Sequence, residues 1–156
     1  PIVFNEAIQN NESVYFIGTK PKVIDLAIQN IKEKFPQLQI CGYRDGYIKD
    51  EDRELVFKDI ILLKADFVIC GMGTPLQEKF LLDLQQAGWN GIGYTCGGFL
   101  HQTAKSIQYY PKWINKLRLR ALYRIYDEPH LIKRYFIDYP QALFVIIKDL
   151  TKNKIS

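Results

Sequence analysis

The stretch that most constrains the fold of this chain is residues 67–81, where a short apolar run ends at two glycines and a proline. The apolar run reads as a buried strand, Gly71 and Gly73 as a tight loop, and Pro75 as the start of a helix. Glycines have no Cβ, so a bound group can approach their main chain, and free N–H groups at a helix start attract phosphate. The stretch therefore predicts a strand, a loop and a helix that together form a ligand site.

Two side chains one turn into this helix belong to the same predicted site. Gln77 and Glu78 can form hydrogen bonds with the hydroxyl groups of a sugar or a ribose. The motif lacks the third glycine of the dinucleotide fingerprint and the Lys-Ser/Thr pair of a P-loop, which argues against both of those classes. A Gly-x-Gly turn that serves only as a tight connection is the structural alternative.

Three further apolar runs, each followed by turn residues and a helical pattern, predict a parallel sheet. Strands that alternate with helices in this way favour an α/β, Rossmann-like fold with a mostly parallel sheet flanked by helices. The expected strands and helices in chain order are 13–18, 21–34, 37–42, 51–64, 67–71, 75–86 and 91–95.

Two of these helices have a clear apolar face at helical spacing, which should pack against the sheet. The side chains expected to be buried are Val23, Ala27, Ile28 and Ile31 in the first, and Leu55, Val56, Ile60 and Leu63 in the second.

Ligands of such sheets bind at the carboxyl ends of the strands, and four glycine-bearing loops of this chain would lie on that edge. We interpret these loops as a nucleotide pocket rather than as four independent turns. A histidine just beyond the last loop is a binding candidate, with a structural hydrogen-bonding role as the alternative. The candidate donor-binding residues are Gly18, Thr19, Asp45, Gly46, Tyr47, Gly71, Met72, Gly73, Pro75, Gln77, Glu78, Gly97, Gly98, His101 and Gln102.

Neither the acidic residues nor the cysteines form a metal-binding pattern. Three consecutive carboxylates, Asp50 to Asp52, diverge around a helix, so we interpret them as a solvated helix start. Cys41, Cys70 and Cys96 contain no Cys-x-x-Cys pair and are expected to be small buried thiols in a reducing compartment. The sequence predicts no metal site and no cofactor, and it contains no apolar run of about 18 residues that would span a membrane.

The charge is divided unequally along the chain. Residues 1–104 carry 10 basic and 13 acidic side chains, whereas residues 105–156 carry 11 basic and 4 acidic ones. We therefore expect an α/β nucleotide-sugar-binding domain over 1–104 and a helical, basic and aromatic appendage over 105–156. Such an appendage suits an anionic membrane surface or a phosphate-bearing partner, although ordinary helix packing also explains its apolar residues.

Within the appendage one continuous helical stripe is expected. It is formed by Leu117, Ala121, Leu122 and Ile125, with Arg118, Arg120 and Arg124 on the remaining surface. Further helices are expected to begin at Pro129 and Pro140. Nucleic-acid binding fits poorly, because the basic residues share their helices with a long apolar face.

The stretch Gly-Met-Gly-Thr-Pro-Leu-Gln-Glu-Lys, residues 71–79, resembles the Gly-x-Gly-x-Pro-x-Gln-Glu signature of the WecB/TagA/CpsF glycosyltransferases. The resemblance covers nearly the whole chain, because other landmarks of the family follow in the family's order. These landmarks are residues 14–18, 35–36, 42–47, 97–99, 110–113, 122–124, 128–129 and 133–135.

The resemblance implies a bacterial transferase at the cytoplasmic face of the cell membrane, attached peripherally. Members pass a sugar, often of the N-acetylmannosamine type, from a UDP-sugar to a polyprenyl-diphosphate-linked acceptor with inversion. They build wall teichoic acid, enterobacterial common antigen, capsule or exopolysaccharide. Residues that would meet the acceptor phosphate or the membrane are Arg118, Arg124, Lys133 and Arg134. Turnover without a divalent metal is expected, and an oligomer or a polysaccharide-assembly partner stays open.

Two departures from the family pattern bear on catalysis. Members usually have a further N-terminal region with a Thr/Asn pair and an Asp proposed as the base, which nothing here matches. The common Phe-Asp after the glycine pair is Phe99-Leu100 here, so His101 or Gln102 would have to replace that carboxylate. Asp45 and Glu78 are the only carboxylates on the expected edge and hence the candidates for a general base. The alternative function is a non-catalytic nucleotide-sugar-binding module that needs a partner or the missing region for activity.

Overall fold

The computed structural model describes residues 2–107, 109–129, 131–133, 136–137 and 139–152. The chain forms two compact units, Pro1–Tyr109 and Tyr110–Ser156, called unit 1 and unit 2 below. Unit 1 contains the four strands of the sheet, and unit 2 is described by itself.

The sheet of unit 1 is four-stranded and parallel, with the order β2-β1-β3-β4. The strands are β1 (Ser13–Gly18), β2 (Gln39–Arg44), β3 (Phe67–Gly71) and β4 (Ile92–Thr95). This arrangement confirms the expected α/β, Rossmann-like fold. β2 lies two residues later than expected because the N–H of Leu38 donates to the carbonyl of Phe35 and closes a turn before the strand.

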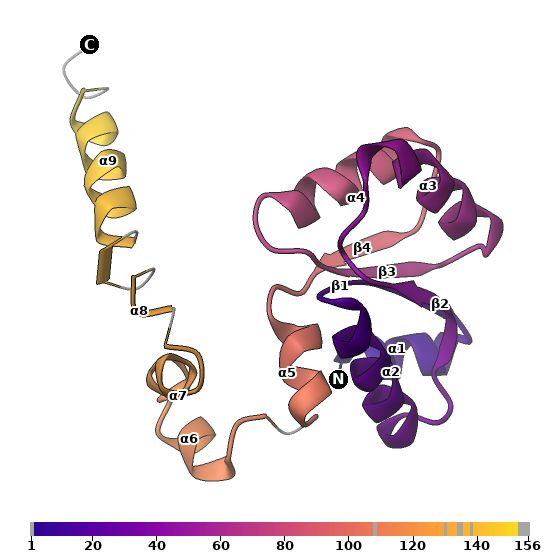
Figure 1. Ribbon diagram of the computed structural model, residues 1–156, viewed down its shortest axis with the longest axis horizontal. Helices are drawn as coiled ribbons and strands as arrows, with labels where there is room; N and C mark the ends of the chain where they lie inside the picture. Colours follow the sequence, from indigo (N-terminus) through magenta and orange to yellow (C-terminus); the bar gives the residue numbers. More distant parts are fainter. Residues whose placement is uncertain (1, 108, 130, 134–135, 138, 153–156) are drawn as a thin grey trace. The chain divides into compact units, whose positions relative to one another are not determined.

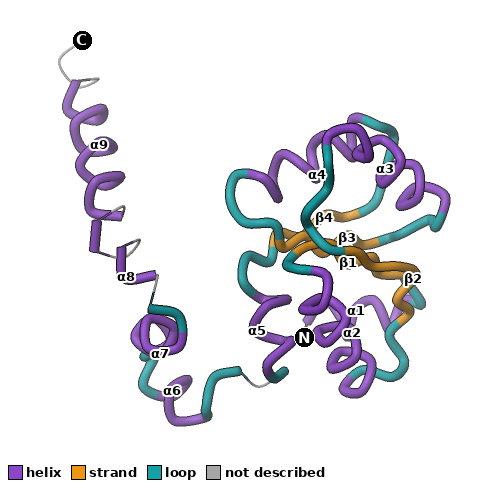
Figure 2. Tube along the Cα trace, in the orientation of Figure 1, coloured by secondary structure: helices purple, strands orange, loops and turns teal. Residues whose placement is uncertain are grey.

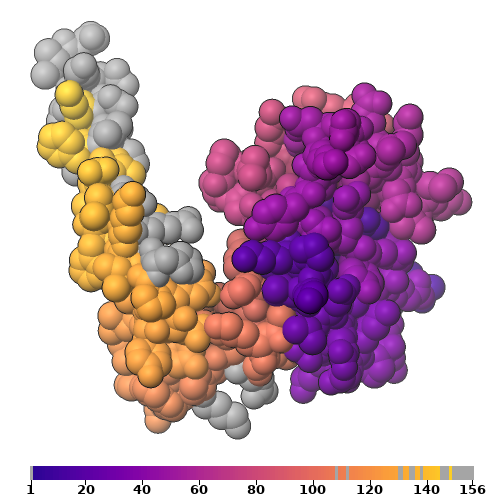
Figure 3. Space-filling view, in the orientation of Figure 1, coloured from indigo at the N-terminus to yellow at the C-terminus, as the bar shows by residue number. Residues whose placement is uncertain are grey.

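Helices cover both faces of this sheet, as the ribbon and the tube show (Figures 1 and 2). α3 (Arg53–Leu62) and α4 (Leu76–Gln86) lie on one face. α1 (Ile2–Asn10), α2 (Pro21–Lys34) and α5 (Phe99–Lys105) lie on the other. In the space-filling view, the indigo and purple surface of residues early in the chain covers the near side of unit 1 (Figure 3).

The two helical layers enclose two apolar cores, one on each side of the sheet. Alternate residues of β1 divide between them, since Val14 and Phe16 join the core under α1, α2 and α5, while Tyr15 and Ile17 join the core under α3 and α4. A strand buried on both faces reads as a continuous apolar run, which is why β1 and β3 are evident in the sequence.

The prediction of which residues form the apolar faces of α2 and α3 was partly wrong. Ile24 rather than Val23 is buried in α2. In α3 the buried residues are Val56, Phe57 and Ile60, while Leu55 is 63% exposed. A short 3-10 turn, Asp50–Asp52, precedes α3, and the helix ends at Leu62, so Leu63 lies at its C-cap, 38% exposed.

Unit 2 contains α6 (Lys112–Lys116), α7 (Arg120–Asp127), α8 (Leu131–Lys133) and α9 (Tyr139–Lys152). The single stripe expected through Leu117 and Leu122 is wrong, because the chain leaves the helical conformation between α6 and α7. Arg118 has a φ of 56° there, so residues before and after it do not share one helix face. Among the described residues no helix is both long and apolar enough to cross a membrane.

The cores of unit 1 predict a loss of stability at alkaline pH. Burial raises the pKa of Tyr15 from 10.0 to about 12, and burial likewise raises the pKa values of Cys70 and Cys96 from 9.0 to about 12. The unfolded chain therefore releases these protons at a lower pH than the folded chain. The contribution of these three protonated groups to the free energy of unfolding is fully present below pH 9. It is lost as the pH rises from about 9 to about 12.

Urea unfolding followed by circular dichroism at a series of pH values measures this loss. Tyr15→Phe should flatten the curve above pH 10, because the phenol is then absent from both states. A midpoint that stays constant up to pH 12 in the original chain would contradict the assignment.

Candidate functional site

The loops after the four strands lie along one edge of the sheet and are joined to one another. The N–H of Gly46 donates to the carbonyl of Thr19 (3.0 Å), and the N–H of Thr19 donates to the carbonyl of Gly71 (3.2 Å). The N–H of Gly97 donates to Oε1 of Gln77 (3.2 Å) and ties the last loop to α4. These loops, residues 18–20, 45–49, 71–75 and 96–98, are joined by hydrogen bonds to one another and to Gln77 and Glu78 at the start of α4, and we call the whole group the carboxyl rim.

Some glycines of the rim are explained by close packing between the loops. A Cβ on Gly18 would overlap the main chain of Gly71, and Gly18 has a φ of 145°. A Cβ on Gly46 would lie 3.0 Å from the Cα of Gly18, and one on Gly71 would lie 2.9 Å from Sγ of Cys96. These three glycines are required for the rim to form, independently of any ligand.

Two other rim glycines face open space. Gly73 has a φ of 80° and Gly97 a φ of 52°, and no atom lies within 4 Å of the position of a Cβ on either. A ligand can approach the main chain at these two points without meeting a side chain. They lie in the loops after β3 and β4, which are neighbouring strands.

Gln77 connects these two loops rather than standing free. Its side chain is 5% exposed, and its Nε2 donates to Oε1 of Glu78 (2.8 Å) and, at a long 3.4 Å, to Oγ1 of Thr74. Because its Oε1 also accepts the Gly97 N–H, the amide is occupied within the protein. Gln77 therefore acts on a ligand chiefly through the groups that it holds in place.

The two carboxylates expected on the rim are both present there and both accept hydrogen bonds. Oδ1 of Asp45 accepts from the N–H of Tyr47 (2.8 Å), which closes a turn. Glu78 is exposed, and the hydrogen bond from Gln77, helped by one from Thr74, lowers the pKa of its carboxyl group. A carboxylate with a lowered pKa is a good hydrogen-bond acceptor and a weak base.

The other expected rim residues differ in their surroundings. Tyr47 is 69% exposed, and Met72 is half-buried beside Gly46. Pro75 follows a cis peptide bond and caps α4, and Gly98 caps α5.

His101 and Gln102 both lie in α5, where His101 is exposed and Gln102 half-buried. Between them and the rim, Leu100 is fully buried in the core of the unit and lies against Gly71. Position 100 therefore supplies packing to the base of the rim, and no polar group there faces a ligand.

One residue of the rim was missed by reasoning from the sequence. The hydroxyl of Thr74 donates to Glu78 (3.2 Å) and lies near Gln77, so it belongs to the same group. The sequence signal that could have identified Thr74 is its position between Gly73 and Pro75 in the motif.

The basic residues expected to meet phosphate belong to unit 2. Arg118 lies in the break before α7, and Arg124 pairs with Glu128 one turn on at 3.7 Å. Lys133 ends α8, and Arg134 lies outside the described residues. In the described ranges no group of three His, Cys, Asp or Glu side chains is placed to hold a metal ion.

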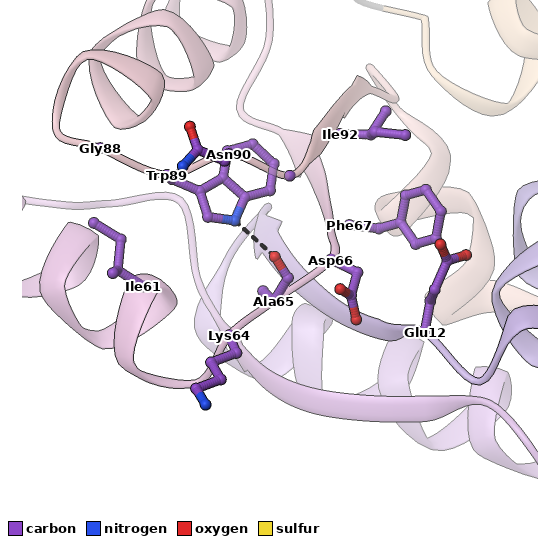
Figure 4. A pocket seen from close by; sticks show the side chains of 11 residues that line it. Glu12, Ile61, Lys64, Ala65, Asp66, Phe67, Gly88, Trp89, Asn90 and Ile92 are labelled. Atoms are coloured by element: carbon purple, nitrogen blue, oxygen red, sulfur yellow. Dashed lines mark hydrogen bonds between the residues drawn. The ribbon is translucent and has the colours of Figure 1, made fainter.

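A hollow of about 420 Å³ lies at the opposite, amino-terminal edge of the sheet, beside the starts of β3 and β4 (Figure 4). Two of its polar side chains, those of Trp89 and Asp66, are already used within the protein. The indole N–H of Trp89 donates to the carbonyl of Ala65 (2.7 Å), and Oδ2 of Asp66 accepts from the N–H and the hydroxyl of Ser13 (2.7 and 2.9 Å). The carboxyl rim, with its open glycines and exposed carboxylate, is the better candidate for a sugar-nucleotide site.

The hydrogen bond that Gln77 accepts from the N–H of Gly97 should have a measurable effect on the rim, and we call this bond the Gln77 bridge. Gln77→Ala removes the acceptor of the Gly97 N–H and should lower the free energy of unfolding by roughly 1–3 kcal/mol. It should also speed hydrogen exchange at the Gly97 amide. Gln85→Ala, on the exposed side of the same helix, is the matched control. Unchanged exchange at Gly97 would show that the bridge does not hold the loop.

The chain matches a family of known proteins over its whole length. Residues 1–156 match the model of the family described as "Glycosyl transferase WecG/TagA/CpsF family". A UDP-Gal:alpha-D-GlcNAc-diphosphoundecaprenol beta-1,4-galactosyltransferase of Shigella boydii is 37% identical, over 94% of this chain and 62% of the relative.

Two relatives from Bacillus are named as a different transferase. Each is named N-acetylglucosaminyldiphosphoundecaprenol N-acetyl-beta-D-mannosaminyltransferase. The protein of Bacillus subtilis (strain 168) is 29% identical, over 97% of this chain and 59% of its own length. That of Bacillus spizizenii is 27% identical, over 94% and 56%. The chain thus spans about three fifths of the length of the curated relatives that it matches.

Proposed function

The chain belongs to the WecG/TagA/CpsF family of glycosyl transferases, and we propose that its carboxyl rim binds the UDP-sugar donor of a glycosyl transfer. The observation that carries this proposal is the pair of open glycines, Gly73 and Gly97, on neighbouring loops beside the exposed carboxylate of Glu78. Open main chain allows a ligand to lie against the loops, and the carboxylate accepts hydrogen bonds from hydroxyl groups.

Glu78 is assigned to hydroxyl groups of the sugar or the ribose. The lowered pKa of its carboxyl group keeps it ionised, and a carboxylate repels the phosphates of a nucleotide. The hydrogen bonds from Gln77 and Thr74 fix its orientation before the donor arrives, which reduces the entropy lost on binding.

The reaction proposed is transfer of the sugar to a polyprenyl-diphosphate-linked acceptor with inversion. Such a transfer needs a base that deprotonates the acceptor hydroxyl and groups that stabilise the departing diphosphate. The lowered pKa makes Glu78 a poor base, and Asp45 is engaged in its own turn. We therefore propose that neither of these two carboxylates is the general base, and a chain that binds the donor without transferring it by itself is the second candidate.

Unit 2 is proposed to meet the acceptor diphosphate and the inner face of the bacterial membrane. Arg118 lies in the break before α7 and Arg124 lies within α7, where Leu122 is 60% exposed and Tyr126 is 85% exposed. Exposed apolar and aromatic side chains next to basic ones suit the surface of an anionic bilayer. The relatives named above act on diphosphoundecaprenol-linked acceptors, which agrees with this placement.

Donor binding can be tested by calorimetric titration with UDP, using ADP as the control ligand. Gly73→Ala should raise the dissociation constant for UDP at least about tenfold, which is about 1.4 kcal/mol, because a methyl group then occupies the open side of the loop. Gly88→Ala is the matched control, since Gly88 also has a positive φ (101°) and open space but lies after α4, at the other edge.

Both substitutions place a Cβ on a residue with positive φ, so each should cost a similar amount of stability, about 1–2 kcal/mol. Equal weakening of UDP binding by both would mean that strain rather than position is responsible. Failure of the original chain to bind UDP would overturn the assignment of the donor site to this rim.

Transfer can be tested with labelled UDP-galactose and UDP-N-acetylmannosamine and GlcNAc-diphosphoundecaprenol as the acceptor. We expect any turnover to be unaffected by EDTA, and Glu78→Gln to reduce it at least about tenfold through loss of a charged acceptor. Acceleration by manganese would contradict the metal-independent mechanism. UDP binding without transfer would favour the second candidate, the donor-binding module.

A further inference from the structure

The first residue of α3, Arg53, contacts α4 in two ways. Its Nη2 lies 2.8 Å from Oδ2 of Asp83, and only 25% and 29% of these two side chains are exposed. Its guanidinium carbon also lies 5.7 Å from the ring centre of Phe80 and 5.7 Å from that of Phe57 in its own helix. A planar guanidinium group can form an ion pair and lie against aromatic rings at the same time. Arg53 is therefore fixed in both distance and orientation relative to α4.

This ion pair joins the end of one rim loop to the helix that presents Glu78. Arg53 directly follows the 3-10 turn Asp50–Asp52, which itself follows rim loop 45–49. Asp83 belongs to α4, which contains Glu78 in its first turn and lies beside α3 on the same face of the sheet (Figure 1). The end of the loop therefore cannot move away from α4 without breaking the pair.

The two ends of this rim loop are held by different contacts. At its start, the N–H of Gly46 binds the loop after β1. At its end, the N–H of Asp52 donates to the carbonyl of Lys49 (3.0 Å), a bond that closes a turn within the same segment. The ion pair of Lys49 with Glu51 is 74% and 75% exposed, so it adds little order. The contacts of Arg53 thus hold the end of the loop to another element, as Gly46 does at its start.

The net contribution of this ion pair to the stability of the fold should be small. Two charges lose hydration when they are withdrawn from water, and their attraction does little more than offset that loss. In addition, Nε of Arg53 is buried and has no hydrogen-bond partner among the described residues, which is unfavourable. The pair is therefore better explained by the geometry that it imposes on the loop than by the free energy of unfolding.

We propose that Arg53 is a positioning residue of the donor site, an inference that rests on the function proposed above. By holding rim loop 45–49 against α4, it keeps Tyr47, which is 69% exposed, at a fixed distance from the exposed carboxylate of Glu78. A donor that contacts both side chains then binds a loop that is already ordered, so less conformational entropy is lost on binding. Arg53 acts through the loop and does not itself contact the donor.

The test replaces the pair by apolar residues, Arg53→Met together with Asp83→Leu, which leaves no unpaired charge. The midpoint of urea unfolding should stay the same or rise, because apolar packing replaces two charges that were withdrawn from water. Hydrogen exchange at the amides of Tyr47 and Asp52 should become at least about tenfold faster, since local opening of the loop is then easier. Exchange at Ile92, at the other end of the strands, should be unchanged.

Donor binding by the same double variant is measured by calorimetric titration with UDP. The dissociation constant should rise at least about tenfold, because the loop must now be ordered on binding. Gln29→Met together with Glu33→Leu is the matched control, since it introduces the same two residues in place of a hydrogen-bonded pair on α2 (3.1 Å). The control should change neither exchange at Tyr47 nor the affinity for UDP.

A conservative variant separates positioning from packing. Arg53→Lys keeps a positive charge beside Asp83 and should retain an affinity for UDP within about threefold of that of the original chain. If Arg53→Lys loosened the loop as much as the double variant does, the ion pair would have no positioning role.

Three results would overturn the proposal while leaving the donor site in place. In the first, the double variant exchanges at Tyr47 and Asp52 as slowly as the original chain. In the second, it exchanges faster at these amides but binds UDP equally well. In the third, exchange is faster throughout unit 1 and the urea midpoint falls, as a merely structural role would predict. Failure of the original chain to bind UDP is a different result, because it would overturn the proposed function and with it any role of Arg53 in binding.

Discussion

The carboxyl rim depends on main-chain hydrogen bonds that cross from one loop to the next, above all the one from Thr19 to Gly71. Parallel strands end at the same edge of a sheet, but their loops need not touch. Here the loop after β2 is bonded to the loop after β1, which is bonded to the end of β3. Close approach of main chains requires glycine at positions 18, 46 and 71, because a Cβ would meet the neighbouring loop. The rim is therefore organised before any ligand is bound.

The glycines of the rim have two different physical roles, and the difference bears on function. Those at positions 18, 46 and 71 allow loops to pack, whereas Gly73 and Gly97 leave main chain open to a ligand. Gln77 joins the two open loops and presents the Glu78 carboxylate at the same time. One buried amide therefore serves both ligand binding and loop structure, and the Gly-x-Gly-x-Pro-x-Gln-Glu motif, residues 71–78, contains the residues for both.

The amino ends and the carboxyl ends of the strands present different chemical groups. At the amino ends, the indole of Trp89 and the carboxylate of Asp66 are used to hold segments of the protein together (Figure 4). At the carboxyl ends, Glu78 is exposed and Gly73 and Gly97 face open space. By its shape alone, the hollow at the amino ends would be chosen as the ligand site. The exposed carboxylate and the open main chain favour the carboxyl ends instead.

The sequence by itself determined the α/β class, the positions of β1, β3 and α4, and the family. A strand buried on both faces must be apolar throughout, and a turn without room for a Cβ must contain glycine, so both leave a local signal. The break at Arg118 and the exposure of Leu55 were not readable, because helix phase and termination depend on what each helix packs against. Only the tertiary structure decided which rim glycines pack and which stay open, that Gln77 is occupied within the protein, and that Leu100 lies in the core. These properties arise from residues far apart in the chain, and no spacing along one segment encodes the distance between two loops.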